Sequence, residues 1–241
     1  MLETVRLPHL PARQLFRFFA ICAAVLVPVT AALAHHPGAN LDAVMGDKEK
    51  FFQAVDLAAP AFELVDAKGE PVRLGDFAGK IVVVNFIYAG CLDVCPLHSE
   101  KIAEVQGLIN ASPMKDRVQF LSITTDPDRD TPDVLAAYGE GHGLDAANWM
   151  LLTRSPGMPE DTTRRIAKSF GLEFTETPDG QQMHGIVTHV IDRDGRLAAR
   201  FHGLRFESVN LVLYINALTN NARAPAPREN KRLWERVLEW F

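Results

Sequence analysis

Two hydrophobic periods alternate along the chain, and this pattern predicts an α/β fold. Residues 81–88 form a run of β-branched and aromatic side chains, interrupted only by Asn85, which is typical of a strand buried on both faces. Further strands are predicted over 117–124, 149–153, 186–191 and 197–201, and a hairpin over 62–74 with its turn at Lys68-Gly69. Helical spacing of apolar residues predicts helices over 97–109, 131–138, 159–170 and 206–218.

The order of these elements is strand, helix, strand, helix, and then a hairpin and a last helix. This order is that of a thioredoxin-like fold, in which helices cover both faces of a mixed central β-sheet. We assign this domain to residues 58–220 and interpret residues 35–57 as a lead-in segment with a short amphipathic piece.

The first 34 residues have the features of a secretory signal peptide. Three arginines and one acid precede an apolar run over 18–34, and Ala32-Leu33-Ala34 is a small-x-small cleavage pattern. An uncleaved N-terminal anchor in the inner membrane is the alternative, although Pro28 interrupts the run and the run is short for a membrane span. Both interpretations predict a periplasmic or extracytoplasmic domain.

The C-terminal residues 221–241 form a predicted tail. A Pro-containing linker, stiff and extended, leads into residues 230–241. There, helical spacing places five apolar side chains on one face: Leu233, Trp234, Val237, Leu238 and Phe241. We expect this amphipathic helix to dock on its own domain, and a contact with a partner or a membrane surface is the alternative.

Composition and charge exclude some classes of function for this chain. The chain has 241 residues, 47% of them hydrophobic, and a net charge of -5. It is long enough to bury a full core, so a disulfide-stabilised mini-protein is excluded. Without residues 1–34 the chain has 22 basic and 29 acidic side chains, a net charge of -7. This acidic balance argues against a nucleic-acid partner, since phosphate binding needs excess Lys and Arg.

Cys91 and Cys95 are the two cysteines that remain after the predicted cleavage, because Cys22 lies in the leader. A disulfide between residues so close in sequence removes little entropy from the unfolded chain, so its value is chemical rather than structural. The pair precedes a predicted helix, whose N-terminal dipole favours the thiolate. Such a pair can form a disulfide, attack one, or bind a soft metal.

A copper site needs a further ligand. Two sulfurs are too few for a closed structural zinc site, whereas two thiolates and one imidazole suit copper. We select His184, since the loop before the predicted strand 186–191 lies beside the cysteine-bearing helix in a thioredoxin-like fold. The pair His35-His36 follows the predicted cleavage point and is a second, amino-terminal candidate for Cu(II). The remaining histidines have no such placement: His98, His142, His189 and His202.

Four motifs together resemble the Sco/SenC family over residues 58–218. They are Phe86-Ile87-Tyr88, Cys91-x3-Cys95-Pro96, the segment Asp126-Pro-x-Arg-Asp-Thr-Pro132, and His184 before a strand. The resemblance implies a thioredoxin-like extracytoplasmic domain that binds a copper ion through Cys91, Cys95 and His184. It also implies a partner, an oxidase subunit, because this family delivers copper to, or keeps reduced, the binuclear copper site of cytochrome c oxidase.

The chain departs from the family pattern at two positions. Leu92 stands where the family usually has proline, and Met183 stands where an aspartate usually precedes the histidine. Loss of that carboxylate removes a hydrogen-bond partner that orients a ligand and tunes metal affinity. Met183 is itself a soft side chain and is a further candidate ligand for Cu(I), with packing as the alternative role.

Other functions use the same residues. Cys91 and Cys95 also suit a thiol-disulfide oxidoreductase, in which one thiol attacks a disulfide and the other resolves the mixed disulfide. A peroxidase is disfavoured, because Leu92 stands where a hydroxyl residue would activate a peroxidatic thiolate at position 95. Between strand and helix, we interpret Thr131 as the helix N-cap and Asp130 as a complement to the helix dipole.

Overall fold

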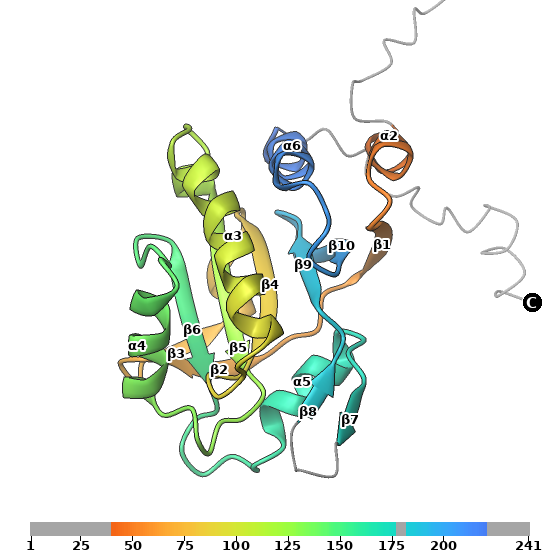
Figure 1. Cartoon of the computed structure of the whole chain (residues 1–241). Helices are drawn as coiled ribbons and strands as arrows, with labels where there is room; N and C mark the ends of the chain where they lie inside the picture. The colour runs from red at the N-terminus through yellow and green to blue at the C-terminus, as the bar shows by residue number, and fades with distance from the viewer. Residues whose placement is uncertain (1–39, 177–181, 221–241) are drawn as a thin grey trace, which may run out of the picture. The chain divides into compact units, whose positions relative to one another are not determined.

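The computed structural model describes residues 40–176 and 182–220, with the backbone alone described for residues 175, 176 and 182–184. Eight strands form one mixed sheet in the order β1-β10-β9-β4-β5-β6-β2-β3 (Figure 1). Their bounds are β1 Phe52–Ala58, β2 Glu63–Asp66, β3 Pro71–Arg73, β4 Ile81–Ile87, β5 Val118–Thr124, β6 Trp149–Thr153, β9 Val187–Ile191 and β10 Arg196–His202. β4, β5 and β6 are parallel, and β9 runs antiparallel to β4.

Helices cover both faces of this sheet, which confirms the predicted thioredoxin-like architecture. Alternate residues of β4 point to opposite faces: Ile81 and Val83 face the core beneath α3 and α6, and Val82 and Val84 face the core beneath α5. The helices are α2 Leu41–Lys48, α3 Val94–Asn110, α4 Pro132–Gly141, α5 Thr162–Ser169 and α6 Ser208–Thr219, with short 3-10 turns η1 Leu74–Phe77 and η2 Lys115–Arg117. Within the described ranges no helix has the length and hydropathy needed to cross a membrane.

The interpretation of residues 35–57 as a lead-in segment is wrong in part. It contains α2 and most of β1, which pairs antiparallel with β10 and forms one edge of the sheet. The buried carboxylate of Glu49 accepts hydrogen bonds from the Glu207 N–H and the Asn210 side chain, both at 2.9 Å. These bonds join the segment to the start of α6. The sequence did not reveal this strand because most of its residues are exposed, so apolar alternation is weak.

One smaller feature also differs from the prediction. A two-stranded sheet of β7 Phe174–Glu176 and β8 Gln182–His184 precedes β9, where a loop was predicted. The buried face of α6 consists of Leu211, Tyr214, Ile215 and Leu218, whereas Val209 and Leu213 are exposed. The predicted leader 1–34, the His35-His36 pair and the tail 221–241 lie outside the described residues.

Candidate metal and redox site

The two cysteines lie where β4 ends and α3 begins. β4 ends at Ile87, the Cys91 N–H bonds to the Tyr88 carbonyl at 3.1 Å, and Cys95 is the second residue of α3. The Cys95 N–H donates to Cys91 Sγ at 3.3 Å. Both thiols are free and buried, with exposures of 5% and 3%. The short connection and the helix start therefore bring the two cysteines together, as their spacing predicts.

The surroundings of the two thiols give them different pKa values. Burial opposes ionisation of Cys91, but hydrogen bonds from the Cys95 thiol, the Asp93 and Cys95 N–H groups and the Tyr88 hydroxyl outweigh it and lower the Cys91 pKa. Burial and donation of its hydrogen bond to Cys91 raise the Cys95 pKa to about 12. Burial and the bond to Cys91 likewise raise the Tyr88 pKa to about 12. Cys91 is therefore the more acidic thiol of the pair and ionises before Cys95.

Asp130 holds the loop that carries the cysteines. Its buried carboxylate accepts a hydrogen bond from the Ala89 N–H at 3.0 Å and another from the Thr124 hydroxyl. Burial raises the pKa of this carboxyl group. The interpretation that Asp130 complements the helix dipole is thus incomplete, because the side chain points into the protein and joins the end of β5 to the cysteine loop.

We expect Asp130→Ala to destabilise the fold by about 2 to 4 kcal/mol, because it leaves two buried donors without an acceptor. The measurement is urea unfolding of the reduced protein. Asp133→Ala is the control, since Asp133 is exposed in the first turn of α4 and its removal should cost about 0.5 kcal/mol. Equal effects of the two substitutions would contradict this role of Asp130.

The neighbouring residues of the same segment have structural contacts. Thr131 caps α4 by accepting a hydrogen bond from the Val134 N–H, and Pro132 follows it in the first turn, as predicted. Arg129 Nε lies 2.6 Å from Asp126 Oδ2, and the Arg129 side chain is exposed. The segment forms part of the site wall through Asp130 rather than through this ion pair.

The strand register places His184 at the same end of the sheet as the cysteines. Val82 and Val84 of β4 pair with Ile191 and His189 of β9, so β9 begins beside the end of β4. The backbone of His184, which pairs with Phe174, lies three residues before β9. Three residues of extended chain span at most about 10 Å, so the His184 backbone lies within about 10 Å of the start of β9. Figure 1 shows β8 and the start of α3 at this end of the sheet.

Among the described side chains, no three from His, Cys, Asp and Glu gather as a metal site. Cys91 and Cys95 provide two sulfurs, and the side chains of Met183 and His184 lie outside the described set. His98 is buried and bonds Thr188 Oγ1 at 2.8 Å, and His189 is buried against the Phe170 carbonyl at 3.2 Å. The other described histidines, His142 and His202, have contacts with Tyr138 and Gln53.

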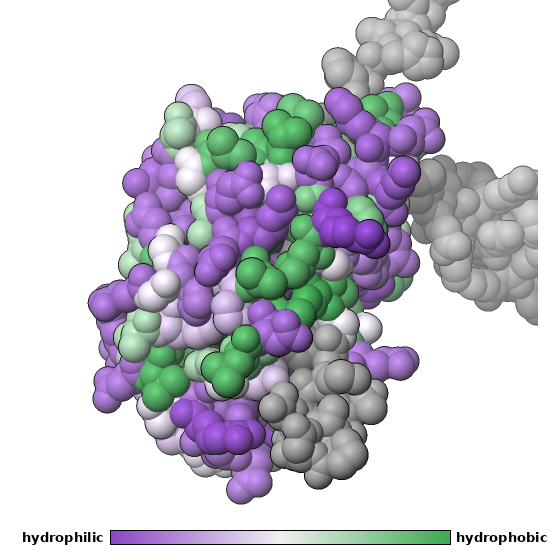
Figure 2. All heavy atoms as spheres, viewed as in Figure 1, coloured by the Kyte–Doolittle hydropathy of each residue, from purple (hydrophilic) through white to green (hydrophobic). Residues whose placement is uncertain are grey.

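An apolar wall surrounds the thiols, and apolar groups reach the surface beside them. Ile87, Leu135 and Tyr138 pack with the two cysteines, and the Tyr138 hydroxyl bonds Ser99 Oγ at 2.8 Å. The Leu92 side chain between the cysteines is 96% exposed. Figure 2 shows apolar groups at the lower end of this face, over the starts of α3 and α4. Sequence reasoning missed Tyr88 and Tyr138, whose roles depend on contacts across the fold.

Comparison with known proteins identifies the family. The SCO1/SenC family model matches residues 53–214. The chain belongs to the Sco/SenC family. It is 27% identical over 143 residues to an SCO2-like protein from Rickettsia prowazekii, a match that covers 58% of this chain and 67% of that protein.

Solved structures of the Sco/SenC family share the fold. An SCO1/SenC family lipoprotein from Bacillus anthracis is 26% identical, with a TM-score of 0.62 over 69% of this chain and 97% of that one. ScoI from Bradyrhizobium japonicum, solved with copper bound, is 26% identical, with a TM-score of 0.55 over 66% of this chain and 98% of that one. The resemblance predicted from the motifs is therefore confirmed for family and fold.

Proposed function

We propose that the reduced domain binds one copper ion through Cys91, Cys95 and His184 and passes it to a partner protein. The observation that carries this proposal is the pair of buried, free thiols at the start of α3, with the His184 backbone at the same end of the sheet. Copper bound to the related ScoI supports the choice of metal.

The donor set fits Cu(I). Thiolates are soft ligands that favour Cu(I), and an imidazole can supply a third position. Cys91 offers a stabilised thiolate, and Cys95 must release its proton when the metal binds, because metal ligands bind in the deprotonated form. The carbon side chains of Ile87, Leu135 and Tyr138 exclude water from one side of the sulfurs.

Transfer requires access for a partner. The exposed Leu92 and the apolar groups at the starts of α3 and α4 form a surface beside the thiols on which a partner can dock. The family resemblance favours an oxidase subunit as the recipient. The apolar segment 18–34 supports a location outside the cytoplasm, with the domain either released or anchored to the inner membrane.

Anaerobic competition for Cu(I) tests this proposal. Loss of a group that only orients a ligand lowers metal affinity about 10- to 100-fold, so loss of a ligand in Cys95→Ser or His184→Ala should lower Cu(I) affinity at least about tenfold. His202→Ala is the matched control, because His202 is exposed at the end of β10. Unchanged affinity in both ligand variants would contradict copper binding at this site.

A second candidate function, thiol-disulfide exchange, is favoured by the difference in acidity between the two thiols. The Cys91 thiolate attacks one sulfur of a partner disulfide, and the other sulfur leaves as a thiolate that takes up a proton. Cys95 then loses its proton and attacks Cys91 Sγ, which releases the second partner thiol. The partner is reduced by two electrons, and this protein gains the Cys91-Cys95 disulfide.

His184→Ala separates the two functions. A copper chaperone loses Cu(I) affinity in this variant, whereas a thiol-disulfide oxidoreductase retains its rate of disulfide reduction, because exchange uses only the two thiols. The measurements are Cu(I) competition and reduction of a small aromatic disulfide by the metal-free protein. A reduction rate that falls with Cu(I) affinity would contradict exchange by the thiols alone.

A further inference from the structure

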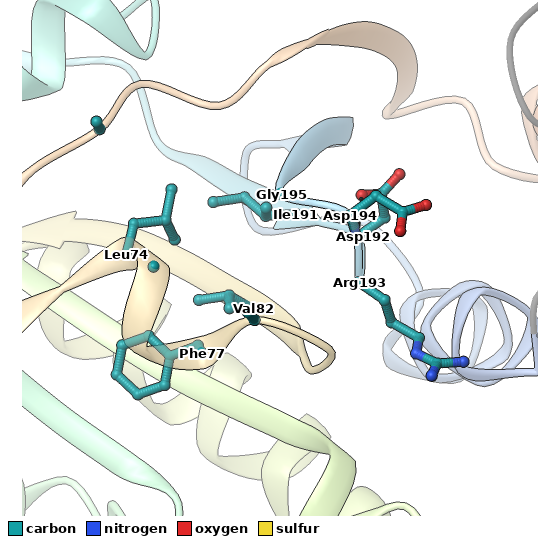
Figure 3. Close-up of a pocket in the computed structure, with 11 residues that line it drawn as sticks. Leu74, Phe77, Val82, Ile191, Asp192, Arg193, Asp194 and Gly195 are labelled. Carbon is teal, nitrogen blue, oxygen red and sulfur yellow. Dashed lines mark hydrogen bonds between the residues drawn. The ribbon is translucent and has the colours of Figure 1, made fainter.

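An open cavity of about 310 Å³ lies at the end of the sheet opposite the cysteines, beside the start of β4. Figure 3 shows Leu74, Phe77, Val82 and Ile191 converging on it from η1, β4 and β9. The last three are buried, and Leu74 is partly exposed at the mouth. This volume is at the lower end of the range of ligand pockets, about 300–1,000 Å³, and suits a large apolar side chain.

The described chain leaves the domain next to this cavity. Arg193 is in the turn between β9 and β10 that lines the cavity, and its guanidinium extends toward α6 (Figure 3). Its Nε donates to the Gly79 carbonyl at 3.1 Å and its Nη1 to the Thr219 carbonyl at 3.5 Å. Thr219 is the last residue of α6. The described part of the chain therefore ends about the length of one arginine side chain from the cavity wall.

The charges of the tail and the domain are opposite in sign. Residues 221–241 contain five basic and three acidic side chains, whereas residues 40–220 contain 17 basic and 26 acidic ones. Asp192 and Asp194 add carboxylates at the mouth of the cavity, while Arg193 points away toward α6. Of the basic side chains of the tail, Arg223 and Arg228 are in the linker, and Lys231 borders the apolar face of the predicted helix.

We infer that the C-terminal segment docks on its own domain by inserting apolar side chains of its predicted helix into this cavity. The linker 221–229 spans at most about 28 Å, so residues 230–241 reach the cavity when the linker bends back toward the domain instead of extending fully. A tether this short keeps the segment at a local concentration on the order of millimolar, so a weak contact suffices. The inference is independent of the copper proposal, because the cavity and the thiols lie at opposite ends of β4.

Fluorine NMR of the full chain labelled with 5-fluorotryptophan tests the docking. The chain has three tryptophans, of which Trp234 and Trp240 are in the tail, and substitution to phenylalanine assigns each signal. A peptide of residues 221–241 gives the reference for the free segment. We expect the Trp234 signal of the whole chain to differ in shift from that of the peptide and to be shielded from a soluble paramagnetic agent.

Ala78→Arg is the diagnostic variant. Ala78 is exposed and lines the cavity, so an arginine there fills the mouth and repels the basic tail while the core stays intact. Trp234 should then move to its free-peptide shift and lose its shielding. Ala136→Arg on the exposed face of α4 is the matched control and should change neither property. Cu(I) affinity should be the same in both variants.

Three results would overturn the inference. The first is a Trp234 signal at the free-peptide shift in the unmodified chain, and the second is a shielded signal that Ala78→Arg leaves unchanged. The third is shielding that disappears on dilution or requires phosphatidylglycerol vesicles, since a second copy or a membrane would then be the occupant rather than this cavity.

Discussion

Iodoacetamide at pH 8 will modify Cys91 about 50-fold faster than Cys95, because alkylation requires the thiolate. The Cys91 pKa lies below its ordinary value of 9.0, and the Cys95 pKa is raised to about 12. The two pKa values therefore differ by at least three units, which corresponds at pH 8 to at least about a 10³-fold difference in thiolate population. The Cys95 thiolate is more basic and therefore about 20-fold more nucleophilic. This reduces the expected ratio of the two alkylation rates to about 50.

Timed alkylation followed by peptide mapping measures this ratio in the reduced, metal-free chain. Both residues are buried, with exposures of 5% and 3%, so the control must remove any difference in access. Urea-unfolded protein is the control, and there the two cysteines should react at similar rates. Equal rates in the folded protein, or faster reaction at Cys95, would contradict the assignment of Cys91 as the more acidic thiol.

Acidification will destabilise the fold through His189, by up to about 5 kcal/mol between pH 6.5 and pH 3. Burial and the nearby charge of Arg200 lower the His189 pKa from 6.5 to about 3. The unfolded chain therefore gains a proton on this imidazole as the pH falls through 6.5, while the folded chain does not. Stability is present above pH 6.5 and is lost as the pH falls toward 3.

The groups around His189 explain why it stays neutral. The guanidinium of Arg200 comes from β10, His98 comes from α3, and the Phe170 carbonyl accepts the imidazole N–H at 3.2 Å. The rings of Phe86 and Phe170 pack edge-on against it. Burial and the positive field of Arg200 oppose protonation more strongly than the backbone hydrogen bonds with Phe170 and Val84 favour it.

Urea unfolding between pH 7 and pH 4 measures the effect. His189→Gln is the test variant, because its amide can still donate to the Phe170 carbonyl but does not titrate. The slope of unfolding free energy against pH should decrease by about 1.4 kcal/mol per pH unit, the value for one proton. His202→Gln is the control and should change the slope less, since burial and Arg200 lower the pKa of the exposed His202 less than that of His189. Equal slopes in wild type and His189→Gln would contradict a neutral buried histidine.

The sequence predicted the central elements well because their signals are local. β4 is an apolar run interrupted only by Asn85, α4 begins with a threonine cap and a proline, and the turn at Gly69 connects two alternating segments. β1 was missed because an edge strand with exposed side chains has little hydrophobic periodicity. Its assignment depends on pairing with β10, more than 130 residues later in the chain.

The candidate site, like the fold, was only partly predictable from the sequence. The spacing of Cys91 and Cys95 before a helix predicts their proximity, because both lie within a few residues of one helix start. The contacts that set their acidity were only partly predictable, since burial and the neighbouring hydroxyl come from the packing of the loop. Asp130 is part of a recognisable motif. Its hydrogen bond with the Ala89 N–H joins residues 41 positions apart, so only the tertiary structure reveals it.

By itself, the sequence determined the family, the α/β architecture, the reactive cysteine pair and His184 as the histidine to consider. These follow from local periodicity, short-range spacing and motif order, which can be recognised in the amino-acid sequence alone. Only the tertiary structure decided which thiol is more acidic, which carboxylate holds the loop, and that a cavity lies where α6 ends. Those properties depend on burial and on hydrogen bonds between distant segments, and neither is encoded in the spacing of neighbouring residues.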